Sequence, residues 1–99
     1  MRLRATVSYG MIVMGYVATK AENRCVTVHE IAERFNLPEP FLVMVVRQLT
    51  HAGLLQSKQG PSGGYSLAKP AHQISMLDII VAVDGTIQDY YEISEDAQN

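Results

Sequence analysis

Two short amphipathic segments, separated by about three residues, constrain the fold of this chain more than any other feature of its sequence. The first begins at Thr27, where Glu30 follows at the spacing of a capping box, and ends at Asn36, a residue that tolerates a left-handed backbone. The second begins at residues 38–40, because proline is favoured in the first turn of a helix, and ends before Gly53. The residues predicted to face the core are Ile31, Ala32 and Phe35 in the first segment and Leu42, Val45, Val46 and Leu49 in the second. Two helices joined by so short a turn are typical of helix-turn-helix proteins.

A further helix is predicted before this pair, over residues 3–18, because apolar residues recur there in steps of three and four. Its inward face is formed by Leu3, Val7, Met11, Met14 and Ala18. Gly10 and Gly15 lie inside this helix and cost about 1 kcal/mol each relative to alanine. We therefore expect a neighbouring element to pack closely against both glycines, and the alternative is a helix that is only marginally stable alone.

The segments after the pair predict a hairpin and a last helix. Residues 54–58 and 65–68 are short strand candidates, and the loop between them predicts a hairpin. We interpret its glycines, Gly60, Gly63 and Gly64, as serving turn geometry and close backbone approach instead of binding phosphate. Ser75 and Asp78 form a second capping box, which predicts a helix ending at Asp84. The order helix, helix, turn, helix, hairpin, helix predicts a mainly α fold with a small β-hairpin, the winged helix-turn-helix.

Charge is distributed unevenly along the chain. Residues 1–70 hold eight basic and four acidic residues, a net charge of +4, whereas residues 71–99 hold six acidic residues and no basic one, a net charge of −6. A positive segment suits a polyanion, and an acidic segment is expected to lie away from it. We therefore expect a nucleic-acid partner for residues 1–70, and the alternative is a chance division of solvated surface charge.

Several classes of function are disfavoured by what the sequence lacks. The longest apolar stretch, residues 11–18, falls short of the roughly 20 residues that cross a bilayer, and no cleavage site follows the basic start. We expect a cytoplasmic protein with no membrane contact. No nucleophile elbow, paired carboxylates, phosphate-binding loop or dinucleotide fingerprint is present, so we expect no enzyme. His29, His51 and His72 lack metal-ligand spacing, so we expect no metal and no cofactor.

Four stretches of sequence carry a family resemblance. They are residues 26–35, VTVHEIAERF; residues 49–55, LTHAGLL; residues 60–70, GPSGGYSLAKP; and residues 74–85, ISMLDIIVAVDG. Taken together they resemble the bacterial winged-helix repressors that include the iron-sulfur cluster regulator IscR, the nitric-oxide sensor NsrR and the cysteine-metabolism regulator CymR. The resemblance covers about residues 1–85. It implies the winged-helix fold, a homodimer and binding to double-stranded operator DNA.

The sequence also departs from the pattern of that family. Members that carry an iron-sulfur cluster have three cysteines just after the last helix of the winged domain, and residues 86–99 contain none. We therefore expect no cluster. We expect residues 1–85 to form the DNA-binding domain and residues 86–99 to be an acidic tail, a remnant of the dimerisation segment. The pairing surface of a dimer is expected to come from the first and last helices together with Ile87, Tyr90, Tyr91 and Ile93.

The second helix of the pair is expected to enter the major groove, with the hairpin on the flanking backbone or in the minor groove. The residues predicted to contact DNA are Thr27, His29, Pro40, Phe41, Met44, Arg47, Gln48, Lys58, Gln59, Gly60 and Ser62. Four of them have an alternative: Thr27 as a helix cap, Phe41 as a cover for the core, and Arg47 and Gln48 as ordinary surface residues. Family members commonly have arginine at the position of Gln59, so we expect a weaker contact here.

Two features leave the function open. Family members usually have polar residues near Val43 and Met44, and here both are apolar. An apolar face on this helix would also suit a winged-helix module that binds a protein partner, which is the alternative function. Cys25 lies beside Arg24, and a neighbouring cation favours the thiolate. Cys25 is therefore a candidate redox sensor, and the alternative is an unreactive free thiol.

Overall fold

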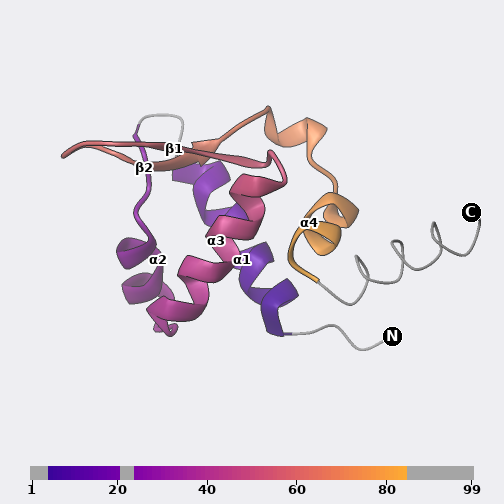
Figure 1. Ribbon diagram of the computed structural model, residues 1–99, viewed down its shortest axis with the longest axis horizontal. Helices are drawn as coiled ribbons and strands as arrows, with labels where there is room; N and C mark the ends of the chain where they lie inside the picture. The colour runs from indigo at the N-terminus through magenta and orange to yellow at the C-terminus, as the bar shows by residue number, and fades with distance from the viewer. Residues whose placement is uncertain (1–4, 21–23, 85–99) are drawn as a thin grey trace, which may run out of the picture.

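The computed structural model describes residues 5–20 and 24–84, and it has the predicted winged order (Figure 1). Its elements are α1 (Ala5–Lys20), α2 (Val28–Phe35), α3 (Glu39–His51), β1 (Leu55–Lys58), β2 (Gly64–Leu67), a 3₁₀ helix (Ala71–Gln73) and α4 (Met76–Val83). The prediction of a mainly α fold with a small hairpin is confirmed. The predicted tail, residues 86–99 with its apolar Ile87, Tyr90, Tyr91 and Ile93, lies outside the described residues.

The helix-turn-helix is formed as its caps predict. The Thr27 hydroxyl accepts a hydrogen bond from the backbone N–H of Glu30 at 3.1 Å, and Asn36 ends α2 with a left-handed φ of 52°. Pro38 is the N-cap of α3, which places Pro40 in the first turn, where a proline removes no hydrogen bond. Ser75 and Asp78 form the predicted capping box at α4, with both reciprocal bonds present.

The hairpin extends beyond the helices in Figure 1 and is anchored to the segment before α2. β1 and β2 pair antiparallel, from Leu55 opposite Leu67 to Lys58 opposite Gly64. Val26 forms an isolated bridge with Tyr65, with N···O distances of 2.9 and 2.8 Å in the two directions. This bridge, which the sequence pattern missed, ties the root of the hairpin to the start of the helix-turn-helix.

The core lies where α1, α3 and α4 meet beneath the hairpin. All four residues predicted for the buried stripe of α3 are less than 2% exposed. Fully buried side chains from the other elements complete this core: Val7, Val13 and Val17 of α1, Val26, Ile31 of α2, and Leu55 of β1. α3 is therefore held on one side by the core, and its other side is free for a partner.

Three expectations about burial are wrong. The buried side of α1 is formed by Val7, Gly10, Val13, Met14 and Val17, so Met11 and Ala18 are only half-buried. A Cβ on Gly10 would lie 3.2 Å from Ile79, which confirms close packing there, but a Cβ on Gly15 would have no atom within 4 Å. Phe35 is 38% exposed, because its ring lies edge-on against Tyr16 instead of entering the core.

Within the described residues, no helix is both long and apolar enough to span a membrane.

Candidate nucleic-acid interface

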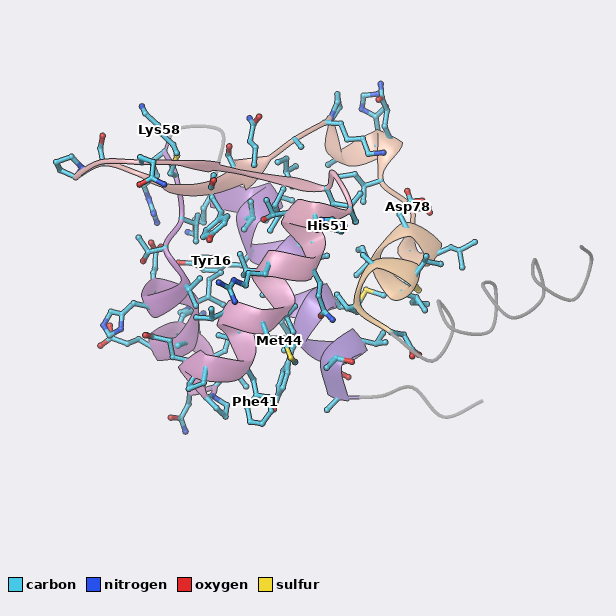
Figure 2. The ribbon with its side chains drawn as sticks, in the orientation of Figure 1. Tyr16, Phe41, Met44, His51, Lys58 and Asp78 are labelled. Carbon is cyan, nitrogen blue, oxygen red and sulfur yellow. The ribbon has the colours of Figure 1, made fainter. Side chains whose placement is uncertain are left out.

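The side of α3 opposite its buried stripe faces solvent, as predicted for the second helix of a helix-turn-helix. Pro40, Met44 and Arg47 are exposed, and Met44 retains 40% of its accessible surface. In Figure 2 the labelled side chains of Phe41, Met44 and His51 follow one another from the start of α3 to its end. This exposed side of α3 is the surface that the helix can present to a groove of DNA.

Two of the residues predicted on α3 are partly engaged within the protein. The ring of Phe41 is 53% exposed and lies 6.4 Å from the ring of Tyr9, so α1 sets its position. Gln48 is half-buried, and its Oε1 is buried with no hydrogen-bond partner among the described residues. Gln48 lines a small hollow with Val81 and Ala82 of α4. The amide of Gln48 is therefore less available to a base than the sequence pattern suggested.

The hairpin and the start of α2 enclose a shallow hollow of about 410 Å³. Four residues predicted to contact DNA line it: Thr27, Lys58, Gln59 and Gly60. The structure thus brings together residues that lie more than thirty positions apart in the sequence. Thr27 is the N-cap of α2, as the alternative to a DNA contact predicted. Its hydroxyl accepts one hydrogen bond there and can still donate its hydrogen to a phosphate.

The glycines of the hairpin loop have the geometric role that the sequence predicted. A Cβ on Gly63 would lie 2.1 Å from the backbone oxygen of Lys58. Gly64 has a φ of +143°, and a Cβ there would lie 2.7 Å from the backbone oxygen of Val26. Only a residue without a side chain fits at these positions. Ser62 is exposed at the turn between the strands.

His29 is exposed at the start of α2 and lies between two carboxylates. Its Nδ1 is 2.8 Å from Oε1 of Glu39, in the first turn of α3, and its Nε2 is 3.3 Å from Oε1 of Glu33. The hydrogen bond to Glu39 and the negative charges of Glu33 and Glu39 raise the pKa of His29 above its ordinary value of 6.5. The sequence analysis did not identify Glu39 as the partner of His29. An acidic residue in the first turn of the second helix of the pair was the signal that could have indicated it.

The raised pKa of His29 predicts a pH-dependent stability. Protonated His29 joins α2 to α3, so its contribution is fully present below the pKa of the unfolded chain and is lost as pH rises through the higher folded pKa. We expect the wild type to exceed His29→Gln in unfolding free energy at about pH 5.5 and to lose this excess by about pH 8.5. Urea denaturation of both proteins across this range measures the difference, and an excess that does not change with pH would contradict the assignment.

A second charged cluster fixes the start of α2 against α1. The Glu30 carboxylate accepts hydrogen bonds from the Tyr16 hydroxyl at 2.6 Å and from Arg24 Nη1 at 2.8 Å. The hydrogen bond from Arg24 and, next, that from Tyr16 hold the pKa of Glu30 down at about 2. Of the capping box predicted at Thr27 and Glu30, the hydrogen bond from the Glu30 N–H to the Thr27 hydroxyl is formed, and the Glu30 carboxylate contacts Tyr16 and Arg24.

Cys25 is half-buried at the junction of this cluster with the hairpin. The guanidinium of Arg24 donates to the backbone oxygen of Cys25 and to Glu30. A Cβ on Gly64 would lie 3.3 Å from the Cβ of Cys25, so the cysteine packs beside β2. The redox role of Cys25 stays a prediction.

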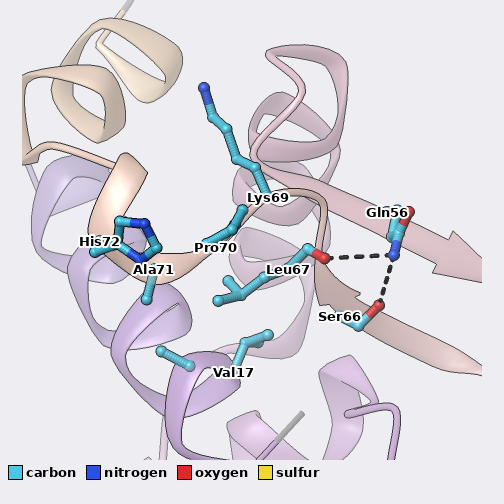
Figure 3. Close-up of a pocket in the computed structure, with 9 residues that line it drawn as sticks. Val17, Gln56, Ser66, Leu67, Lys69, Pro70, Ala71 and His72 are labelled. Carbon is cyan, nitrogen blue, oxygen red and sulfur yellow. Dashed lines mark hydrogen bonds between the residues drawn. The ribbon is translucent and has the colours of Figure 1, made fainter. Parts of the chain in front are cut away.

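A wider hollow, of about 760 Å³, lies between the end of α1, the hairpin and the 3₁₀ helix (Figure 3). Val17 and Leu67 form apolar parts of its wall, and Lys69 and His72 lie at its polar side. In Figure 3 the amide of Gln56 donates to the backbone oxygen of Leu67, at 3.3 Å. None of the residues predicted to contact DNA lines this hollow.

Comparison with known proteins identifies relatives of this arrangement. The Rrf2 family, described as an iron-dependent transcriptional regulator, matches residues 3–99. The HTH-type transcriptional regulator IscR of Cereibacter sphaeroides is 34% identical over 89 residues, which are 88% of this chain and 57% of the relative. The chain spans about half the length of the curated relatives that it matches.

Solved structures agree with this result. CymR, the global cysteine regulator of B. subtilis, superposes with a TM-score of 0.82 at 32% identity, over 86% of this chain and 66% of that chain. The oxidized form of CymR from Staphylococcus aureus has a TM-score of 0.79 at 32% identity, over 98% of this chain and 85% of that chain. The predicted resemblance to the winged-helix repressors is therefore confirmed.

Proposed function

Because the chain belongs to the Rrf2 family of transcriptional regulators, we propose that it binds double-stranded DNA in a sequence-specific manner and regulates transcription. The family consists of regulators, in agreement with the expectation that this protein is not an enzyme. We further propose that it acts in the cytoplasm, as a repressor. Residues 1–85 would serve as the DNA-binding domain, and residues 86–99 would lie outside the contact.

One observation carries the proposal. The exposed face of α3 and the hollow between α2 and the hairpin together contain eight of the residues expected to contact DNA. They are Pro40, Phe41, Met44 and Arg47 on α3, and Thr27, Lys58, Gln59 and Gly60 around the hollow. A helix for the major groove and a hairpin for the adjacent backbone are the two contacts that a winged helix makes.

The family description mentions iron, and the residues of this chain do not fit a resident iron-sulfur cluster. Such clusters are held mainly by cysteine thiolates, and the sequence has a single cysteine. Residues 5–20 and 24–84 contain no group of three or more His, Cys, Asp or Glu side chains that could hold a metal ion. We propose a regulator whose DNA contacts are made without a cluster held by these residues.

We propose that the protein binds as a homodimer to a two-fold symmetric operator. A pool of random duplexes of about 30 base pairs tests this, because two half-sites one helical turn apart fit within that length. The immobilised protein is incubated with the pool at moderate salt, and the retained duplexes are sequenced. A symmetric motif is expected. A single half-site would contradict the homodimer, and binding without an enriched motif would contradict sequence-specific regulation.

A second function is favoured by one observation, the exposure of apolar side chains on α3. Phe41 is 53% exposed, Val43 41% and Met44 40%. Such a patch also suits a protein partner, as in a winged-helix interaction module. If no motif is enriched and Met44→Glu disrupts a complex captured with a protein, this second function replaces the first.

A further inference from the structure

The first two turns of α3 offer almost no hydrogen-bonding side chain to a partner. Apart from Glu39, whose carboxylate contacts His29, the exposed residues there are Pro40, Phe41, Val43 and Met44, and none of these four side chains carries a donor or a strong acceptor. Helical spacing places Pro40, Met44, Arg47 and His51 in one row down the exposed side. The row therefore begins apolar and becomes polar only at Arg47.

The polar side chains that flank this row are engaged elsewhere. The carboxylate of Glu39, at the start of α3, is drawn towards α2, because its Oε1 accepts a hydrogen bond from His29 at 2.8 Å and only its second oxygen is left for a base. Gln48 has its Oε1 buried against α4, which hinders a bidentate contact to adenine. Within the described part of α3, Arg47 is the cation that this face can offer.

The chemistry of the major groove limits what such a face can recognise. The edges of guanine, cytosine and adenine are read there by hydrogen bonds, whereas thymine alone also presents a methyl group, at C5. An apolar side chain gains favourable burial energy when it covers that methyl group, and it discriminates poorly among the edges of the other three bases. The cation at Arg47 and the hollow that holds Lys58 favour a polyanion over an apolar protein surface as the occupant of this face.

We propose that Met44 and Val43 recognise thymine methyl groups, so that each half-site places A·T pairs beneath the first two turns of α3. The inference rests on the proposed function and names the base chemistry that the same site reads. Arg47 then supplies a hydrogen-bonding contact one turn further along the helix. Specificity at these A·T pairs comes from van der Waals contact with the methyl group.

The test replaces thymine by uracil, which pairs identically and lacks only the C5 methyl group. Duplexes recovered from the random pool are synthesised with single thymines changed to deoxyuridine, and dissociation constants are measured by fluorescence anisotropy. We expect about a three- to fourfold loss of affinity for each contacted methyl group, the factor that corresponds to burying one methylene-sized group. Thymines outside the half-sites are expected to show no loss.

Two variants locate the effect on the protein. The readout is the dissociation constant of the uracil duplex divided by that of the thymine duplex. Met44→Ala is expected to reduce this ratio towards one at the position that Met44 covers. Met76→Ala is the matched control, because Met76 is 66% exposed at the start of α4 and has the same side chain. The control is expected to keep the full ratio. Because the readout is a ratio of two affinities, a change in overall affinity or stability does not imitate the effect.

The outcomes separate the inference from the function on which it depends. Equal binding of thymine and uracil duplexes by the wild type would overturn the inference and leave DNA binding intact. Loss of the ratio in Met76→Ala as well would overturn the assignment to Met44. Absence of a recovered motif would remove both the inference and the proposed function.

Discussion

A Gly63→Ala variant is expected to lose most of its affinity for the operator while its helices remain folded. The added Cβ would lie 2.1 Å from the backbone oxygen of Lys58 and 3.0 Å from the carbonyl carbon of Gln59, and neither atom belongs to a flexible side chain. The strand end that carries Lys58 must therefore move. Overpacking of this kind costs about 1–3 kcal/mol, and we expect the loss of DNA affinity to reach about tenfold or more.

Gly15→Ala is the matched control for this variant. It adds the same Cβ in α1, where no atom lies within 4 Å, and it replaces a glycine inside a helix. It is expected to raise the unfolding free energy by about 0.5–1 kcal/mol and to leave DNA affinity unchanged. Urea denaturation and fluorescence anisotropy measure both proteins. Unchanged DNA affinity in Gly63→Ala would remove the hairpin from the interface.

Removal of either of the two cations of the proposed interface, Arg47 or Lys58, is expected to have the second large effect. Arg47→Ala should weaken binding about 5- to 150-fold if the guanidinium contacts a base, since a good bidentate contact is worth about 1–3 kcal/mol. Lys58→Ala should weaken binding to all sequences alike, because a phosphate contact carries no sequence information. Affinity falls with salt, and each phosphate contact that is lost should make the negative slope of log affinity against log salt less steep by about 0.9.

Lys69→Ala is the matched control for charge. Lys69 lines the hollow of Figure 3 and not the one beside α2, so its removal changes the net charge without touching the interface. Its salt slope is expected to equal that of the wild type. A slope that stays the same in both Arg47→Ala and Lys58→Ala would contradict the assignment of these contacts.

Local patterns in the sequence predicted most of the fold, because they act through the backbone of a few neighbouring residues. The caps at Thr27 and Ser75, the left-handed Asn36 and the stripe of α3 are all found in the structure. Each depends on hydrogen bonds or periodicity within one element. The glycines of the hairpin were also interpreted correctly, because the short loop between two strands leaves few other conformations.

Features that depend on contacts between elements were predicted less well. Phe35 has the spacing of a core residue, yet it lies against Tyr16 at the surface. Gly15 has the spacing of a packing contact, yet nothing lies near it. The bridge between Val26 and Tyr65 joins residues far apart in the chain, and no local pattern marks it. These outcomes depend on how helices cross, which periodicity within one helix does not define.

In the candidate site, too, features set within one helix were predicted from the sequence, and contacts between elements were not. Exposure of Met44 and Arg47 follows from the buried stripe of α3, so the sequence predicted it. The engagement of His29 with Glu39 and of Glu30 with Tyr16 needs the positions of two helices at once. The sequence therefore predicted which side chains are exposed at the candidate interface but not the partners within the protein that restrict them.

The most direct test of the proposed interface is a titration of ¹⁵N-labelled protein with the recovered duplex, followed by NMR. The largest amide shifts are expected in residues 27–29, 41–48 and 57–62, which lie at the start of α2, in α3 and in the hairpin. Small shifts are expected in residues 69–73, at the hollow of Figure 3. Shifts confined to α1 and residues 69–73, with α3 unchanged, would contradict the claim that this protein reads DNA through its helix-turn-helix and hairpin.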